Sequence, residues 1–166
     1  AVAFFERLRQ IEESSEHIIV LAGPVSFLLA SDSFCETLEE VLAESIPDGG
    51  AEHDRAQDMV RELTPILRRR KDNWRTRKPG ILNLISGAEI DRFLRNGLVG
   101  RLDLPDDVLA ERRTRARAEA QHLIRLMEEE PIGIQIGVVP GALPHSSFQI
   151  FRQADRKILT LSPFRL

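Results

Sequence analysis

The sequence predicts an α/β domain in which helices cover a mixed β-sheet of about five or more strands. Up to about residue 130, short apolar segments rich in β-branched residues alternate with segments whose apolar residues recur at helical spacing. The last third of the chain instead contains three strand-like segments with short connections. Strands separated by helices favour a covered parallel sheet, whereas strands joined by turns pair antiparallel, so the sheet is mixed. The length of 166 residues suits one domain.

The first part of the chain predicts a helix, a strand and a second helix. One face of the first helix is apolar and consists of Phe4, Phe5, Leu8 and Ile11. The apolar run 17–23 ends at a Gly-Pro pair and is typical of a strand that is buried on both faces. The segment 31–44 has helical spacing, and Ser33 with Glu36 forms a capping box near its start.

The middle of the chain predicts a loop followed by a helix. Residues 45–54 are rich in Pro and Gly, which is typical of a loop. The helix begins at about Asp54, and the basic residues from Arg68 to Lys71 lie at its end, where the helix dipole favours cations. Pro65 is expected to kink this helix or to split it in two.

The remaining elements are a strand, two helices and three strands. The strand spans 81–86, and Ser86 with Glu89 caps a short helix that Gly97 ends. A long helix follows over roughly 106–130. Its apolar seam is narrow and rich in small residues, and consists of Leu109, Ala116, Ala120, Leu123 and Met127. The last three strands are predicted over 132–139, 147–152 and 157–162, and the final two form an antiparallel hairpin.

The composition narrows the class of protein and its compartment. The formal net charge of −3 argues against a free-standing nucleic-acid-binding protein. The one cysteine, Cys35, excludes an internal disulfide and fits the reducing cytoplasm, and we expect it to be an unreactive, at least half-buried thiol. No apolar run reaches the ~18 residues of a membrane span, and the start of the chain lacks a signal-peptide pattern. We therefore expect a cytoplasmic protein with no membrane partner.

The sequence lacks the patterns of three common kinds of functional site. No group of His, Cys, Asp and Glu residues has the spacing of a zinc site, so we expect no metal and no cofactor. The segment 21–26, "LAGPVS", lacks the second and third glycines of a dinucleotide-binding loop. Ser146, His145 and Asp155 contain the residue types of a catalytic triad, but the chain has no nucleophile elbow.

The segment 144–157, "PHSSFQIFRQADRK", carries the clearest chemical pattern. It resembles the motif of the phospholipase D-like family, in which His, any residue, Lys, four residues and Asp lie on a strand before a turn. The resemblance implies a histidine nucleophile and a lysine that holds phosphate oxygens. His145 matches the histidine, but Ser147 replaces the lysine and Arg152 replaces the aspartate. The resemblance therefore implies a strand that has lost the family's catalytic chemistry.

We expect this strand to contribute to a site for a small anionic ligand, with His145, Ser146, Ser147 and Arg152 as the candidate residues. Two alternatives stay open. In one, His145 is a loop residue, and the two serines after it cap the local backbone. In the other, His145 is the nucleophile of a divergent phosphodiesterase or nuclease, and Arg152 or Arg156 supplies the cation.

Four further segments carry a likeness that spans most of the chain: "FFERLRQIEESSEHIIVLAG", "ILRRRKDN", "ISGAEIDRFL" and "IGIQIGVVPGALPHSSFQIF". With them the chain resembles the C-terminal regions of bacterial helix-turn-helix transcription regulators of the Xre type. The resemblance implies a regulatory and dimerisation domain, with the DNA contacts made by a domain upstream of it. The chain does not begin with Met, which would fit such an upstream domain. Phospholipase D-like enzymes with one motif pair two copies, so it also implies a homodimer with a cleft between the His145 regions. A protein-interaction scaffold without a ligand is the remaining alternative.

The run 68–78, "RRRKDNWRTRK", holds seven cations in eleven residues and the one tryptophan. The candidates for contact with phosphate or the DNA backbone are Arg68, Arg69, Arg70, Lys71, Trp74 and Arg75. In this interpretation the cations bind phosphate and the indole offers a stacking surface. The alternative is a solvated helix end and loop, neutralised by nearby acidic residues.

Overall fold

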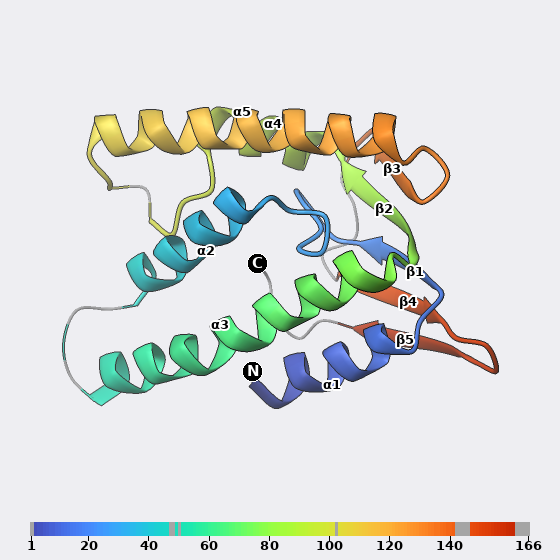
Figure 1. Ribbon diagram of the computed structural model, residues 1–166. Helices are drawn as coiled ribbons and strands as arrows, with labels where there is room; N and C mark the ends of the chain where they lie inside the picture. Colours follow the sequence, from blue (N-terminus) through green and yellow to red (C-terminus); the bar gives the residue numbers. More distant parts are fainter. Residues whose placement is uncertain (1, 47–48, 50, 102, 142–146, 162–166) are drawn as a thin grey trace.

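The computed structural model describes residues 2–46, 49, 51–101, 103–141 and 147–161, and shows five helices and five strands there (Figure 1). The helices are α1 (Val2–Glu13), α2 (Asp32–Glu44), α3 (Ala51–Arg77), α4 (Gly87–Asn96) and α5 (Asp106–Glu129). The strands are β1 (His17–Leu21), β2 (Gly80–Ser86), β3 (Ile134–Val139), β4 (Phe148–Arg152) and β5 (Lys157–Leu161). The predicted α/β class and the predicted order of elements are confirmed.

The five strands form one mixed sheet in the order β3-β2-β1-β4-β5. β1 pairs in parallel with β2, and β2 pairs in parallel with β3, because helices separate each pair along the chain. β4 and β5 are joined by a short turn and pair antiparallel, which confirms the predicted hairpin. β4 also pairs antiparallel with β1, so the first strand of the chain lies at the centre of the sheet.

The hydrophobic core lies between one face of the sheet and the helices, which gather on that side in Figure 1. Ile18, Ile81 and Phe151 point from three neighbouring strands into this core and are almost completely buried. Leu8 of α1 and Leu123 of α5 pack against them from the helical layer. Alternate side chains of each strand therefore point toward the helices, which cover this face of the sheet.

The helix α3 differs from the prediction, since it is one continuous helix over 27 residues and includes Pro65. Proline at this position removes the hydrogen bond that its backbone N–H would donate to the carbonyl of Arg61. Both residues are exposed, so water can satisfy that carbonyl and the helix continues. The same helix extends past Lys71 to Arg77, which carries the second half of the basic run along a helical surface instead of a loop.

The ends of three elements also correct the prediction. Ser31, and not Ser33, caps α2, since its hydroxyl accepts a hydrogen bond from the backbone N–H of Phe34 at 3.1 Å. Ser86 is the N-cap residue of α4, but its hydroxyl does not cap the helix and instead donates to the carbonyl of Gly141 at 2.7 Å. β3 begins two residues later than predicted and leaves Ile132 in a turn, 92% exposed. These ends depend on hydrogen bonds between segments that are distant in sequence or on turn geometry, which periodicity does not encode.

Gly97 ends α4 as predicted, and the structure gives two reasons for glycine there. Its φ angle is 78°, a conformation that residues with a Cβ rarely adopt. A Cβ at this position would also lie 2.6 Å from the backbone carbonyl carbon of Arg112 on α5. Glycine therefore lets α4 approach α5 closely.

Candidate functional site

The face of the sheet opposite the core is apolar, and no helix of the described chain packs against it (Figure 1). We call it the open face. Two cross-strand rows make up its centre: Leu82, Ile19, Ile150 and Leu159 in one, and Leu84, Leu21, Phe148 and Leu161 in the other. On the edge strand β5, Leu159 is 60% and Leu161 is 63% exposed. Exposed apolar surface of this kind marks interaction sites more often than single exposed residues do.

The open face corrects in part the prediction that the first strand is buried on both faces. On this face Ile19 of β1 is only half-buried and Leu21 is buried, whereas Ile18 and Val20 on the core side are both buried. A continuous apolar run shows that both faces are non-polar. It does not show whether a helix of the same chain covers the second face, and among the described helices none does.

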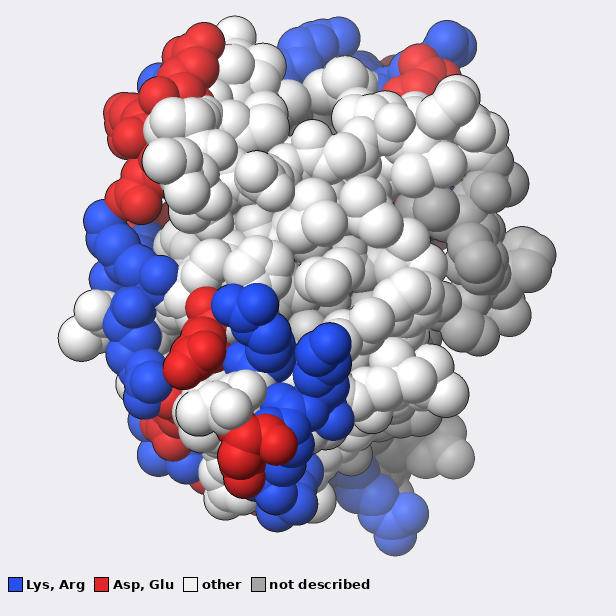
Figure 2. All heavy atoms as spheres, turned by 90° about the vertical axis from the view of Figure 1, so that its right-hand side faces the viewer, with Lys and Arg blue, Asp and Glu red and all other residues white. Residues whose placement is uncertain are grey.

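One end of the open face is basic. His17, Arg152 and Lys157 are register partners in a third cross-strand row, and no Asp or Glu lies at the described positions of this face. Figure 2 faces the side of the molecule on which the β4–β5 turn lies, and in it Lys and Arg lie along the left margin, at the lower end and at the top, with Asp and Glu among them. A broad area between them carries no charged residue in that view. Charge on the open face is thus confined to one end of the strands.

The strand β4 holds the described part of the phospholipase D-like segment. Ser147 directly precedes β4 and Arg152 ends it, so the two are separated by five residues of extended chain, roughly 16 Å. The structure does not bring these two candidates together. His145 and Ser146 lie outside the described residues. The predicted ligand site of four residues is therefore not assembled by the part of β4 that is described.

The basic run is divided between buried and exposed residues. Arg70 and Lys71 are buried, so the prediction that they contact phosphate or DNA is wrong for these two. Arg70 makes a two-point ion pair with buried Glu12, with Nε–Oε2 at 2.9 Å and Nη2–Oε1 at 2.7 Å. Lys71 donates to Asp32 at 3.1 Å. These pairs join α3 to α1 and to the start of α2.

The other members of the run are exposed or half-buried, and three of the exposed cations have acidic partners, among them Lys78, which pairs with Glu130. Arg68 pairs with Glu39 at 3.1 Å, and Arg75 pairs with Asp32 at 2.6 Å. Arg69 is exposed. Trp74 is half-buried, packs against the core and has its indole N–H buried, so its ring is not a free stacking surface. These contacts favour the alternative of a surface neutralised by nearby acids.

A cavity of about 230 Å³ lies between α2 and α5, with α4 beside it. Its polar lining comes from Arg112, Arg115, Glu119, His122 and Arg125 of α5, and from Ser31 and Ser33 at the start of α2. Its apolar lining includes Phe34, Phe93, Leu98 and Ala116. The sequence analysis missed this cavity because it followed the apolar seam of α5. Charged residues at spacings of three and four beside that seam were the signal that could have found it.

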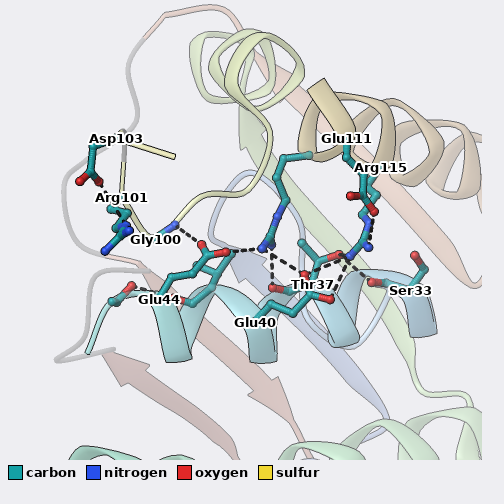
Figure 3. Close-up of polar contacts among 12 residues, drawn as sticks. Ser33, Thr37, Glu40, Glu44, Gly100, Arg101, Asp103, Glu111 and Arg115 are labelled. Atoms are coloured by element: carbon teal, nitrogen blue, oxygen red, sulfur yellow. Dashed lines mark hydrogen bonds and ion pairs between the residues drawn. The ribbon is translucent and has the colours of Figure 1, made fainter. Parts of the chain in front are cut away.

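Ion pairs and hydrogen bonds connect the two helices beside this cavity (Figure 3). Arg112 is buried and pairs with Glu44 and, at 3.0 Å, with Glu40. Arg115 reaches the same helix, where it donates to the Thr37 hydroxyl at 3.1 Å and to Glu40 at 3.2 Å (Figure 3). The carboxylate of Glu111 and that of Glu40 raise the pKa of Arg115, so the guanidinium stays charged.

Two further buried groups have unusual surroundings. Asn83 of β2 is completely buried on the core side, and neither atom of its amide has a hydrogen-bond partner among the described residues. The thiol of Cys35 accepts from Lys71 at 3.3 Å, but burial outweighs this cation and raises the pKa of the thiol. The structure thus supplies the nearby cation that a reactive cysteine needs, and burial opposes its effect.

No family model, no curated protein and no solved structure matches the chain significantly. The residues that the structure describes hold no cluster of three or more His, Cys, Asp or Glu side chains suited to a metal ion. Within the same residues no helix is long and apolar enough to cross a membrane.

Proposed function

We propose that the domain forms a homodimer through the open face of its sheet, and that it is the non-catalytic regulatory part of a DNA-binding transcription regulator. The observation that carries this proposal is the apolar face formed by the two central rows, which none of the described helices covers. Face-to-face packing of two sheets is a common way to bury such rows, with the sheets ~10 Å apart.

The size of the open face fits a weak dimer. Five strands at a spacing of ~4.8 Å and five residues at ~3.3 Å give a flat footprint of roughly 400 Å² per copy. Two such footprints total roughly 800 Å², which is below the ~1,200 Å² at which stable specific interfaces begin. We therefore expect weak, concentration-dependent association.

The distribution of charge also supports self-association. A two-fold axis that lies in the plane of the interface and runs across the strands would place the basic row of one copy (His17, Arg152 and Lys157) at the far end from the basic row of the other. The rows would be separated by about a strand length, ~17 Å, which is beyond the Debye length of ~8 Å at physiological salt. The apolar rows then meet each other, and the basic rows do not repel.

The regulatory role rests on two kinds of support. The family's catalytic lysine and aspartate are replaced by Ser147 and Arg152, which lie at opposite ends of β4. The resemblance to Xre-type regulators supplies the class, with DNA contacts from a domain upstream of this chain. Because Arg70 and Lys71 are buried and Arg68 and Arg75 are paired, the proposal does not assign DNA binding to this domain.

The test is the oligomeric state measured by sedimentation velocity at protein concentrations from roughly 1 to 200 μM. We expect a concentration-dependent dimer that the double substitution Leu159→Glu and Leu161→Glu converts to a monomer. Ile124→Glu is the matched control, because Ile124 is 51% exposed on α5, away from the open face. A wild-type monomer at all concentrations, or a dimer that only the control disrupts, would contradict the proposal.

A further inference from the structure

The cavity between α2 and α5 combines charged side chains with an apolar wall. Three arginines line it, Arg112, Arg115 and Arg125, together with one carboxylate, that of Glu119. His122 lies beside them, with its Nε2 at 3.1 Å from the carbonyl oxygen of Leu29. The charge of a ligand that this lining favours depends on which of these groups is left without a partner in the protein.

The charged side chains that line the cavity differ in whether other residues of the protein pair with them. Arg112 and Arg115 are held by carboxylates of α2, and Glu119 accepts hydrogen bonds from the backbone N–H of Ser31 at 2.9 Å and from its hydroxyl. Arg125 has no hydrogen bond or ion pair with any described residue, and it is exposed at the cavity. It is thus the cation of this cavity that is available to a ligand.

The apolar part of the lining suits an apolar group of a ligand. Phe34 of α2 and Phe93 of α4 meet edge to face, with ring centroids 6.1 Å apart. Leu98 and Ala116 also line the cavity.

We propose that this cavity binds a small organic acid with an apolar, ring-sized body, whose carboxylate pairs with Arg125 and whose body packs on Phe34 and Phe93. A volume of about 230 Å³ would hold about eight waters at ~30 Å³ each, so it fits a compact acid and is smaller than a drug-sized site. The site lies on the helical side of the sheet, apart from both the open face and β4. It goes beyond the proposed dimer and does not require it.

The test uses three probes that share a ring and differ in charge: benzoate, benzamide and benzylammonium. Each is titrated into the ¹⁵N-labelled domain, and backbone amide shifts are followed by NMR. We expect benzoate to shift the amides of Phe34, Phe93 and Leu98 in a saturable manner, and the other two probes to bind at least several-fold more weakly. Arg125→Gln should weaken benzoate binding about tenfold, the effect of one charge-assisted hydrogen bond.

Arg117→Gln is the control, since Arg117 is also exposed on α5 and does not line the cavity. It should leave benzoate binding unchanged. Equal binding of benzoate and benzamide, equal effects of the two arginine substitutions, or shifts that map elsewhere would each overturn the proposal. The titration is repeated on the Leu159→Glu and Leu161→Glu variant, so that loss of the dimer and loss of the ligand site are read separately.

Discussion

Replacing Arg70 with Met is expected to lower the free energy of unfolding by about 3–5 kcal/mol, because it leaves Glu12 buried without its counter-charge. Arg70 and Glu12 are 4% and 6% exposed, and two hydrogen bonds of 2.9 and 2.7 Å join them. The guanidinium also lies 5.5 Å from the ring centre of Phe5 and 5.6 Å from that of Phe27. Met preserves part of this packing, so the expected loss reports mainly on the unpaired carboxylate.

The assay is urea unfolding followed by circular dichroism, with thermal unfolding as a second readout. For a chain of this size the expected loss corresponds to a fall in Tm of roughly 6–20 °C. Arg68→Met is the control, because Arg68 is exposed and its pair with Glu39 should contribute at most about 1 kcal/mol. The double substitution Glu12→Leu with Arg70→Met should recover most of the loss, since no buried charge remains.

A result in which Arg70→Met costs no more than Arg68→Met would refute the buried pair. It would mean that Arg70 reaches solvent, and would reopen the prediction that it contacts phosphate. A double substitution as unstable as Arg70→Met alone would show instead that packing, and not the unpaired charge, accounts for the loss.

Two other predictions concern single side chains. Asn83→Leu should raise the free energy of unfolding by about 1–2 kcal/mol at unchanged m-value. The reason is that the buried amide, which lies between Val20 and Ile136 of the neighbouring strands, has no hydrogen-bond partner among the described residues. A decrease in the free energy of unfolding would show that the amide is hydrogen-bonded in solution. Hydrogen bonds from Arg75 and Lys71 lower the pKa of Asp32, so its stabilising effect is present above the ordinary value of 3.8 and is lost as the pH falls through the lowered value. Asp32→Asn should therefore lower Tm at pH 7 by a few degrees at most, since the carboxylate is 72% exposed, and the difference from wild type should vanish at about pH 2. A difference that grows on acidification would contradict this assignment.

The order of elements could be predicted from the sequence because each has a clear period. The helices show apolar residues at spacings of three and four, and the strands are short apolar runs between turn residues. What could not be predicted depends on solvent and on distant segments. Pro65 lies within a helix because Pro65 and Arg61 are both exposed, so water can satisfy the carbonyl that proline leaves unpaired. Ser31 caps α2 and also contacts Glu119 on a helix 88 positions away.

The candidate site was harder to predict because a charged residue looks the same in sequence whether it faces solvent or a buried partner. The run of 68–78 contains both kinds, and helical spacing alternates between them: Arg68 and Arg69 are exposed, whereas Arg70 and Lys71 are buried. Their partners, Glu12 and Asp32, lie 58 and 39 positions earlier. No local pattern shows such a pairing, so the run resembled a phosphate-binding surface.

Only cations that are not already paired with acidic residues of the same chain are available to bind another molecule. Arg70 holds α3 to α1, and Arg112 holds α5 to α2, so these cations are part of the scaffold. Surface pairs occupy Arg68 and Arg75. Among the described cations without an ion pair, Arg125 lies at the cavity and Arg152 and Lys157 lie at one end of the open face, whereas Arg69 and Arg117 lie on exposed helix surface away from both. The cavity and the open face lie on opposite sides of the sheet, which is why we assign the small acid and the second copy to separate sites.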